Sequence, residues 1–348
     1  AFGPVAHAAD WPAWRGPNGD GISTERNLPL TWDESKNVRW KVALPAPGNS
    51  TPIIWGKHLF LTQGLDGGKQ RGILAFERET GKPLWQRMLP CDVKETTHKQ
   101  NPPCSGSSVT DGETVYAWLG SAGVVAYDFD GKERWRRDLG PIVSRWGHGS
   151  SPILYKDLLI VFHGPGVPKT FLIALDKRTG KTVWQADEKS IDSPVFGCWS
   201  TPVIVAVNGR EELILPLPGD AVGGEGYFKA YEPSSGKLLW TCKGLGNEIY
   251  AMPAVNETRD LVLGISGHNG PLLAVKPGGT GDVKPLWRAT KNPQRIGSGV
   301  FHEGRFYLPN ANPSMIECID PKTGASLWKE RVDGNLWGSM LLAEGRIY

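Results

Sequence analysis

The chain has 348 residues, 22% of them charged, and a formal net charge of only +3. Such a small net charge, without a basic run, argues against nucleic acid as a partner, and no stretch approaches the roughly 18 apolar residues of a transmembrane helix. The 44 glycines, 28 prolines and 15 tryptophans are typical of a chain built from many short strands and turns.

The first residues predict export. Residues 1–9, "AFGPVAHAA", end in an A-x-A-like pattern and carry no initiator Met. We interpret them as the remnant of a signal peptide, which predicts a periplasmic or extracellular protein. Residues 10–36 form an N-terminal leader ahead of the first repeat.

From residue 37 onward, one phrase recurs. "ALDKRTGKTVW" (174–184) begins with a small residue, passes through a Thr-Gly turn and ends at a tryptophan. Related phrases end at six further tryptophans: Trp40, Trp85, Trp135, Trp240, Trp287 and Trp328. With Trp184 included, successive tryptophans are 41 to 56 residues apart. A period of about 40–50 residues is typical of propeller blades.

Each repeat reads as four short strands in chain order. A small-residue segment such as "GSSPIL" (149–154) comes first, followed by apolar runs such as "LLIVF" (158–162) and "FLIAL" (171–175), and then the tryptophan strand. No long segment has a 3.6-residue periodicity. We therefore predict an all-β fold, a β-propeller of four-stranded antiparallel blades over residues 37–348, with six full blades and part of a seventh.

The recurring phrase has a structural explanation. Its glycine can adopt the positive φ that a tight turn requires, and a tryptophan is large enough to fill the gap between neighbouring blades. We expect seven residues to dock the blades in this way: Trp40, Trp85, Trp135, Trp184, Trp240, Trp287 and Trp328.

The two ends of the repeat array are incomplete. "NVRWKV", around Trp40, is expected to be an N-terminal strand that completes the last blade. The last residues, "LLAEGRIY" (341–348), end two strands into the seventh unit. We therefore expect a truncated propeller, whose complete ring has seven blades if Trp40 closes that unit and eight otherwise.

The sequence offers no catalytic or metal-binding motif. The seven histidines are dispersed, and there is no C-x-x-C pair and no G-x-S-x-G elbow. Five cysteines are an odd number for an exported protein. Cys91 and Cys104 flank one loop and are a disulfide candidate, while the other three are expected to be buried thiols.

The repeated phrase resembles the tryptophan-docking repeat of the pyrroloquinoline-quinone-like (PQQ-like) β-propellers. This superfamily contains quinoprotein alcohol dehydrogenases and the propeller lipoprotein of the β-barrel assembly machinery. "WPAWRGPNGDGIS" (11–23) and "NPQRIGSGV" (292–300) resemble exported bacterial members. The resemblance spans about residues 37–348, favours eight blades in the complete ring, and implies either an enzyme or a scaffold.

We predict a ligand site at the axial mouth. In propellers, the loops before the innermost strands rim one face, and aromatic and cationic side chains there suit a planar, anionic or sugar ligand. The alternative is that Trp199 and Trp337 plug the channel. A second candidate face is the loop at 91–104. The predicted mouth residues are Asn49, Arg145, Trp146, His148, Trp199, Glu248, Tyr250, Arg295 and Trp337.

Two functions follow. The first is a non-catalytic exported propeller, monomeric when complete and without a cofactor, that binds a protein, peptide or glycan. The second, implied by the resemblance, is an oxidoreductase that uses PQQ with Ca²⁺ on alcohols or sugars. The adjacent cysteine pair of many such dehydrogenases is absent here. We favour the first function.

Overall fold

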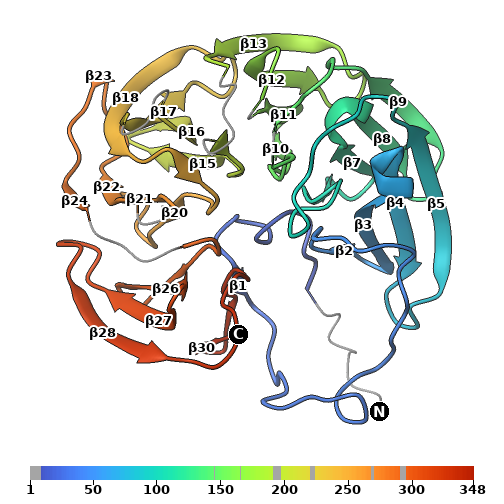
Figure 1. The fold of residues 1–348 in the computed structure, drawn as a ribbon, viewed down its shortest axis with the longest axis horizontal. Helices are drawn as coiled ribbons and strands as arrows, with labels where there is room; N and C mark the ends of the chain where they lie inside the picture. The colour runs from blue at the N-terminus through green and yellow to red at the C-terminus, as the bar shows by residue number, and fades with distance from the viewer. Residues whose placement is uncertain are drawn as a thin grey trace.

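The computed structural model describes residues 9–144, 146–164, 166–190, 197–219, 224–267, 270–290 and 295–348. Its strands form sheets that follow one another around a central axis in chain order (Figure 1). The described residues contain no α-helix, but two single-turn 3-10 segments, η1 (Asp66–Gly68) and η2 (Gly120–Ala122). The predicted all-β propeller is therefore confirmed. No helix in these ranges is long and apolar enough to cross a membrane.

The first three blades are regular four-stranded antiparallel sheets. Neighbouring strands in each blade are consecutive in the chain, as the repeat predicts. The strands are, for blade 1, β2 (Ile53–Trp55), β3 (His58–Leu65), β4 (Gln70–Glu77) and β5 (Pro83–Pro90); for blade 2, β6 (Val109–Thr110), β7 (Thr114–Trp118), β8 (Val124–Asp128) and β9 (Glu133–Arg137); and for blade 3, β10 (Ile153–Tyr155), β11 (Leu158–His163), β12 (Thr170–Asp176) and β13 (Thr182–Glu188).

The next three blades follow the same plan with additions. A short parallel pair, β14 (Gly197–Cys198) with β19 (Glu248–Ile249), forms a separate two-stranded sheet, in which Cys198 contacts Pro216 of blade 4. The strands are, for blade 4, β15 (Val203–Val207), β16 (Arg210–Leu217), β17 (Gly226–Tyr231) and β18 (Leu238–Leu245), extended by β23 (Gly281–Asp282); for blade 5, β20 (Ala254–Val255), β21 (Val262–Ile265), β22 (Leu272–Val275) and β24 (Trp287–Ala289); and for blade 6, β25 (Val300–His302), β26 (Arg305–Ala311), β27 (Ser314–Ile319) and β28 (Ser326–Arg331).

The seventh unit differs from the prediction. It holds β29 (Leu342–Ala343) and β30 (Arg346–Ile347), and its added strand is β1 (Ile22–Ser23) from the leader, parallel to β29. The segment around Trp40 forms no strand. The prediction of a strand there was wrong because no third strand lies beside this segment to pair with its backbone in the described chain.

Indole rings connect successive blades. In five cases, the indole Nε1 of one unit donates a hydrogen bond of 2.7–2.9 Å to a backbone carbonyl in the turn of the next blade. Each turn also contains a glycine with φ of 70–78°. A methyl group added to that glycine would lie 2.5–2.8 Å from the indole. The tryptophan–glycine pairs are Trp40–Gly81, Trp85–Gly131, Trp135–Gly180, Trp184–Gly236 and Trp287–Gly324.

Two tryptophans depart from this arrangement. Trp240 donates its Nε1–H to the buried Glu212 carboxylate at 2.8 Å, because the corresponding turn of blade 5 carries three extra residues and β23 pairs along β18. Trp328 is 42% exposed. The expectation that Trp328 lies between blades is wrong for the described chain, where no following turn covers it.

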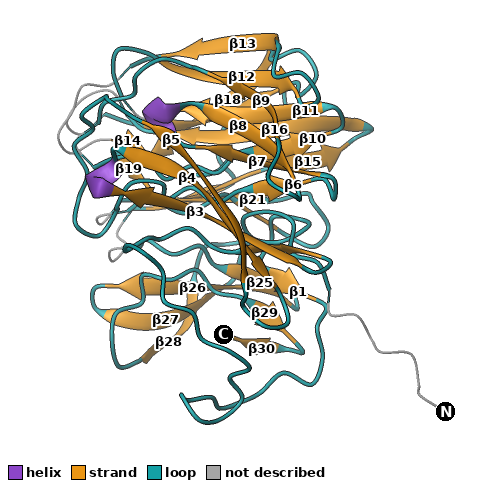
Figure 2. Ribbon diagram, turned by 90° about the vertical axis from the view of Figure 1, so that its right-hand side faces the viewer, coloured by secondary structure: helices purple, strands orange, loops and turns teal. Residues whose placement is uncertain are grey.

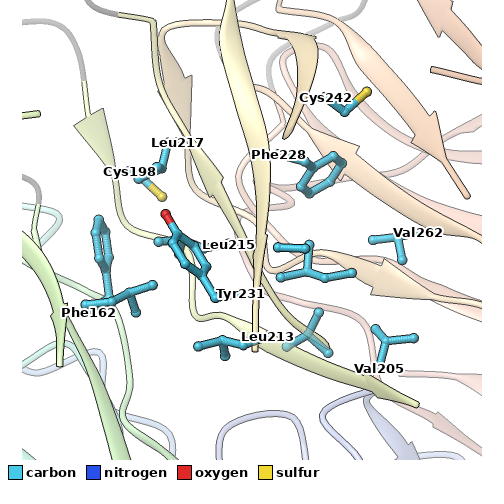
Figure 3. Close-up of a cluster of buried hydrophobic side chains, with 14 of the residues drawn as sticks. Phe162, Cys198, Val205, Leu213, Leu215, Leu217, Phe228, Tyr231, Cys242 and Val262 are labelled. Carbon is cyan, nitrogen blue, oxygen red and sulfur yellow. The ribbon is translucent and has the colours of Figure 1, made fainter. Parts of the chain in front are cut away.

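The apolar core lies between neighbouring blades. The largest cluster joins side chains of blades 3, 4 and 5. Figure 3 shows part of it, with Phe162 of β11 and Val262 of β21 on either side of blade-4 residues such as Leu213. The core is therefore shared between blades.

The leader crosses the hub and touches most of the ring. Trp11 and Ile54 exchange backbone hydrogen bonds of 2.8 and 2.9 Å in blade 1, and the Pro12 carbonyl accepts from Thr110 N–H in blade 2. Trp14 packs on the cluster of blades 3 to 5. The buried Arg15 guanidinium donates to carbonyl oxygens of blade 6 and of the seventh unit. The leader thus covers the face where the inner strands end.

Hydroxyl groups join the inner strands near the axis. In five places, a backbone N–H donates to a Ser or Thr hydroxyl of the next blade at 2.9–3.0 Å. In blades 2 and 6, Ser107 and Ser298 supply the hydroxyl. The pairs, donor first, are Thr51–Ser107, Ser107–Ser151, Ser151–Thr201, Met252–Ser298 and Ser298–Ser339.

The two environments of the repeated tryptophan make a matched test. Trp184→Ala should lower the free energy of unfolding by about 3–5 kcal/mol, since Trp184 is 8% exposed and its removal leaves a cavity. Trp328→Ala, at an exposed position, should cost less than about 1 kcal/mol. Urea unfolding of both variants measures this, and equal costs would contradict a docking role for Trp184.

The turn glycine makes a second matched test. In Gly180→Ala, the new residue must adopt a φ of 70°, and its Cβ would lie 2.6 Å from the Trp135 ring. In Gly304→Ala, the φ is also 70°, but no atom lies within 4 Å of the new Cβ. We expect a loss of about 1–2 kcal/mol for Gly304→Ala and a clearly larger loss for Gly180→Ala. Similar unfolding free energies for the two variants would show that the indole does not need the glycine.

Candidate functional site at the axial face

The face opposite the leader carries the predicted mouth. Because each inner strand runs toward the leader, the loops before these strands lie on the other side. In the side view, β14 and β19 lie at the left edge beside the 3-10 turns, and β1 lies away from that edge (Figure 2). One face is therefore covered by the leader, and the other presents loops.

An aromatic pair stands at the centre of this site. Trp199 and Tyr250 stack with ring centroids 5.0 Å apart and planes 20° apart. The Trp199 indole donates to the Gly147 carbonyl at 2.7 Å, and the Tyr250 hydroxyl donates to Glu248 Oε2 at 3.0 Å. The β14–β19 pairing sets this geometry because each aromatic directly follows one strand or the other. Both rings are half-buried.

The loop at 91–104 lies on the same face. Asn49 Nδ2 donates to the Gln100 carbonyl at 2.7 Å, which ties the loop to blade 1. The His98 ring lies 4.5 Å from the Trp146 ring, and Asn101 Nδ2 donates to the Trp146 carbonyl ahead of blade 3. The two candidate faces predicted from sequence are thus continuous.

A buried ion pair anchors this loop. Glu95 Oε1 accepts from Arg71 Nη1 at 2.7 Å and from Ser121 N–H at 2.8 Å. Glu95 Oε2 lies 3.7 Å from His148 Nδ1, and all three charged or ionisable side chains are 2% exposed. Burial alone would raise the pKa of Glu95, but His148, Arg71 and Ser121 together lower it to about 2.

The sequence placed His148 and Arg295 at the mouth, and both are buried. His148 packs against Trp118, with ring centroids 4.7 Å apart. Arg295 is 1% exposed and donates to Glu317 Oε2 at 2.8 Å and Asn310 Oδ1 at 2.9 Å inside blade 6. The repeat spacing predicted that both residues precede inner strands. It did not predict the ion pairs with Glu95 and Glu317 that keep the two side chains buried.

The remaining predicted residues have mixed outcomes. Trp337 is half-buried before β29, and Arg145 lies outside the described residues. Sequence reasoning missed Arg71 and Glu95. A charged residue inside the apolar run "QRGILAFE" (70–77) was the available signal for Arg71, because a buried arginine needs a partner.

The predicted disulfide is not formed. Cys91 and Cys104 are both buried free thiols. Cys104 is fully buried among Val115, Leu119 and other apolar side chains, and this burial raises the pKa of its thiol to about 12. In this structure the loop ends are therefore held by packing, and Glu95 ties the loop to the scaffold.

Metal ligands are scarce here. Within the described ranges, no group of three or more His, Cys, Asp or Glu side chains is placed to hold a metal ion. On the described part of this face, the buried arginines Arg71 and Arg295 are each paired with a carboxylate, and the Glu248 carboxylate accepts a hydrogen bond from Tyr250.

Comparison with known proteins gives the chain a family context. A family described as "Outer membrane protein assembly factor BamB" matches residues 22–139 and 69–329. The quinoprotein alcohol dehydrogenase PedH of Pseudomonas putida is 25% identical over 345 aligned residues, covering 94% of this chain and 43% of that protein. The outer membrane protein assembly factor BamB of Yersinia pestis is 23% identical over 271, covering 74% and 61%. This chain spans less than two thirds of either relative, and the PQQ-like resemblance is confirmed.

Solved structures support the same fold. BamB from Moraxella catarrhalis superposes with a TM-score of 0.57 at 15% identity, covering 86% of this chain and 77% of that one. The quinohemoprotein alcohol dehydrogenase from Comamonas testosteroni gives a TM-score of 0.52 at 11% identity, covering 98% and 77%. Identities this low bear on the propeller fold alone.

The Glu95 anchor makes stability depend on pH. Because the folded-state pKa lies near 2, below the ordinary value of 4.5, the anchor's contribution is present above about pH 4.5 and is lost as the pH falls toward 2. The loss approaches about 3 kcal/mol. Urea unfolding between pH 7 and pH 3 should therefore show a shallower pH dependence for Glu95→Gln than for the control Glu79→Gln, whose carboxylate is exposed. Identical slopes would contradict the anchor.

Proposed function

Because this chain belongs to the family described as outer membrane protein assembly factor BamB, we propose that it is an exported, non-catalytic propeller that binds a protein partner. The relatives whose names refer to assembly support a scaffold. The A-x-A-like ending of residues 1–9 supports export, although residues 1–8 lie outside the described structure.

The observation that carries the proposal is the aromatic pair beside an anchored polar loop. Trp199 and Tyr250 are half-buried, stacked and held by hydrogen bonds, so little side-chain entropy remains to be lost on binding. Tyrosine and tryptophan are enriched among residues that dominate interfaces. The exposed Gln100 and its neighbours supply a polar rim. Such a surface suits a polypeptide.

A quinone cofactor fits these residues poorly. PQQ is a tricarboxylate, and a site for it needs available cations. Among the described residues, which do not include the predicted mouth residue Arg145, the buried arginines on this side are Arg71 and Arg295, and each is paired with a carboxylate, Glu95 and Glu317 respectively. The sequence has no adjacent cysteine pair. The oxidoreductase alternative rests on relatives such as PedH, of which this chain spans 43%.

Site-specific photo-cross-linking in the native host tests the proposal. A photo-reactive residue at Lys99, on the anchored loop, should give one discrete cross-linked protein, whereas the same residue at the exposed Lys181 of blade 3 should not. Trp199→Ala with Tyr250→Ala should reduce the yield at least about tenfold, with thermal unfolding close to that of the parent. Equal cross-linking from both positions would contradict a binding face here.

A separate assay addresses the alternative. Purified protein incubated with PQQ and Ca²⁺ should show no dye-linked oxidation of alcohols or sugars. Oxidation that saturates with PQQ would replace the scaffold proposal by the enzymatic one.

A further inference from the structure

A cavity lies between blades 3 and 4, and neither Trp199 nor Tyr250 lines it. Its volume is about 330 Å³, at the small end of the range for ligand sites. Phe162, Cys198 and Leu217, which come together on one side of the buried cluster in Figure 3, form part of its wall.

Apolar groups form most of this wall. Blade 3 contributes Phe162 from β11, and blade 4 contributes Leu217 at the end of β16, Pro218 directly after it and Tyr227 of β17. Phe162, Leu217 and Pro218 are buried, and Tyr227 is half-buried. Two blades therefore present aromatic rings and aliphatic side chains to one enclosed space.

The charged groups in the wall are already engaged with partners. Lys229 Nζ lies 2.6 Å from Glu188 Oε2, and the Glu188 side chain is 6% exposed. The other Glu188 oxygen accepts a hydrogen bond from the buried Tyr231 hydroxyl. Lys189, the third charged residue of the described lining, is not free either. A charged ligand thus meets no group that lacks a partner of its own.

Other polar groups of the wall are satisfied as well. The Thr170 hydroxyl donates to the Gly166 carbonyl at 3.0 Å, and the Cys198 thiol donates to the Pro216 carbonyl at 3.0 Å. Among the described residues, none of the buried side-chain atoms that lack a hydrogen-bond partner belongs to the lining. A polar or charged ligand would therefore lose its hydration without gaining new hydrogen bonds in return.

We propose that this cavity binds a neutral, mainly apolar small molecule whose body lies against Phe162, Leu217 and Tyr227. An apolar cavity of about 150 Å³ accommodates benzene, so about 330 Å³ has room for an aromatic ring with a short alkyl chain. Burial of this apolar surface would drive binding. The site does not depend on the proposed protein-binding face, so each can fail without the other.

Calorimetric titration with propylbenzene and with 3-phenylpropanoate tests the proposal. Each ligand has a phenyl ring on a short chain, but only the second is charged. The parent protein should bind one equivalent of propylbenzene, and it should bind the acid at least about tenfold more weakly, because the carboxylate must be desolvated. Added salt should not weaken the binding of propylbenzene, since no ionic contact is involved.

Two matched variants locate the binding. Leu217→Phe adds bulk to the cavity wall and keeps every charge, so it should weaken the binding of propylbenzene at least about tenfold. Leu238→Phe introduces the same side chain at a position of blade 4 that is 47% exposed and outside the described lining, so the affinity should stay unchanged. If Leu217→Phe does not fold by circular dichroism, Tyr227→Ala, at a half-buried position, should weaken binding at least about threefold by removing an aromatic contact.

Three results would overturn the proposal. The first is the absence of saturable binding of propylbenzene to the parent protein, which would mean that the cavity holds only water. The second is an affinity for the acid equal to or higher than that for propylbenzene. The third is an unchanged affinity for propylbenzene in the folded cavity variant.

Discussion

The contact between an indole ring and a turn glycine holds this propeller together. It joins residues some 45 positions apart, such as Trp135 and Gly180, and it works only because the glycine has no side chain and adopts a left-handed conformation. The indole hydrogen bond to the same turn fixes the ring in place. Each blade thereby positions the next one. These repeated contacts therefore also set the distances between the axial loops.

Local chemistry explains what could be predicted. The blades and the positions of the tryptophans could be predicted from the sequence. The signals that indicate them, which are the repeat period, the turn glycines and the strand patterns, each depend on residues close together in the chain. The direction of His148 and Arg295 could not be predicted, because it depends on Glu95 and Glu317, which are far along the chain or in another strand. The hydroxyl contacts of Ser107 and Ser298 could not be predicted either, since each hydroxyl is identified by its donor in the preceding blade.

The two faces of the ring are covered by different parts of the chain. The leader is tied to blades 1 and 2 by backbone hydrogen bonds and to blade 6 by Arg15, so that face is occupied by the chain itself. The opposite face carries the stacked rings and a loop held by the buried pair of Arg71 and Glu95. The surface that we propose for recognition thus lies opposite the face that the leader covers.

The leader's contacts also bear on how the molecule acquires its structure. Residues near the start of the chain bond to residues near its end: Arg15 reaches Met340, and Ile22 pairs with Leu342. Contacts between positions more than 300 residues apart carry a large loop-closure cost and slow folding. During synthesis, Arg15 and Ile22 must therefore wait for residues 340–342 before these contacts across the hub can form.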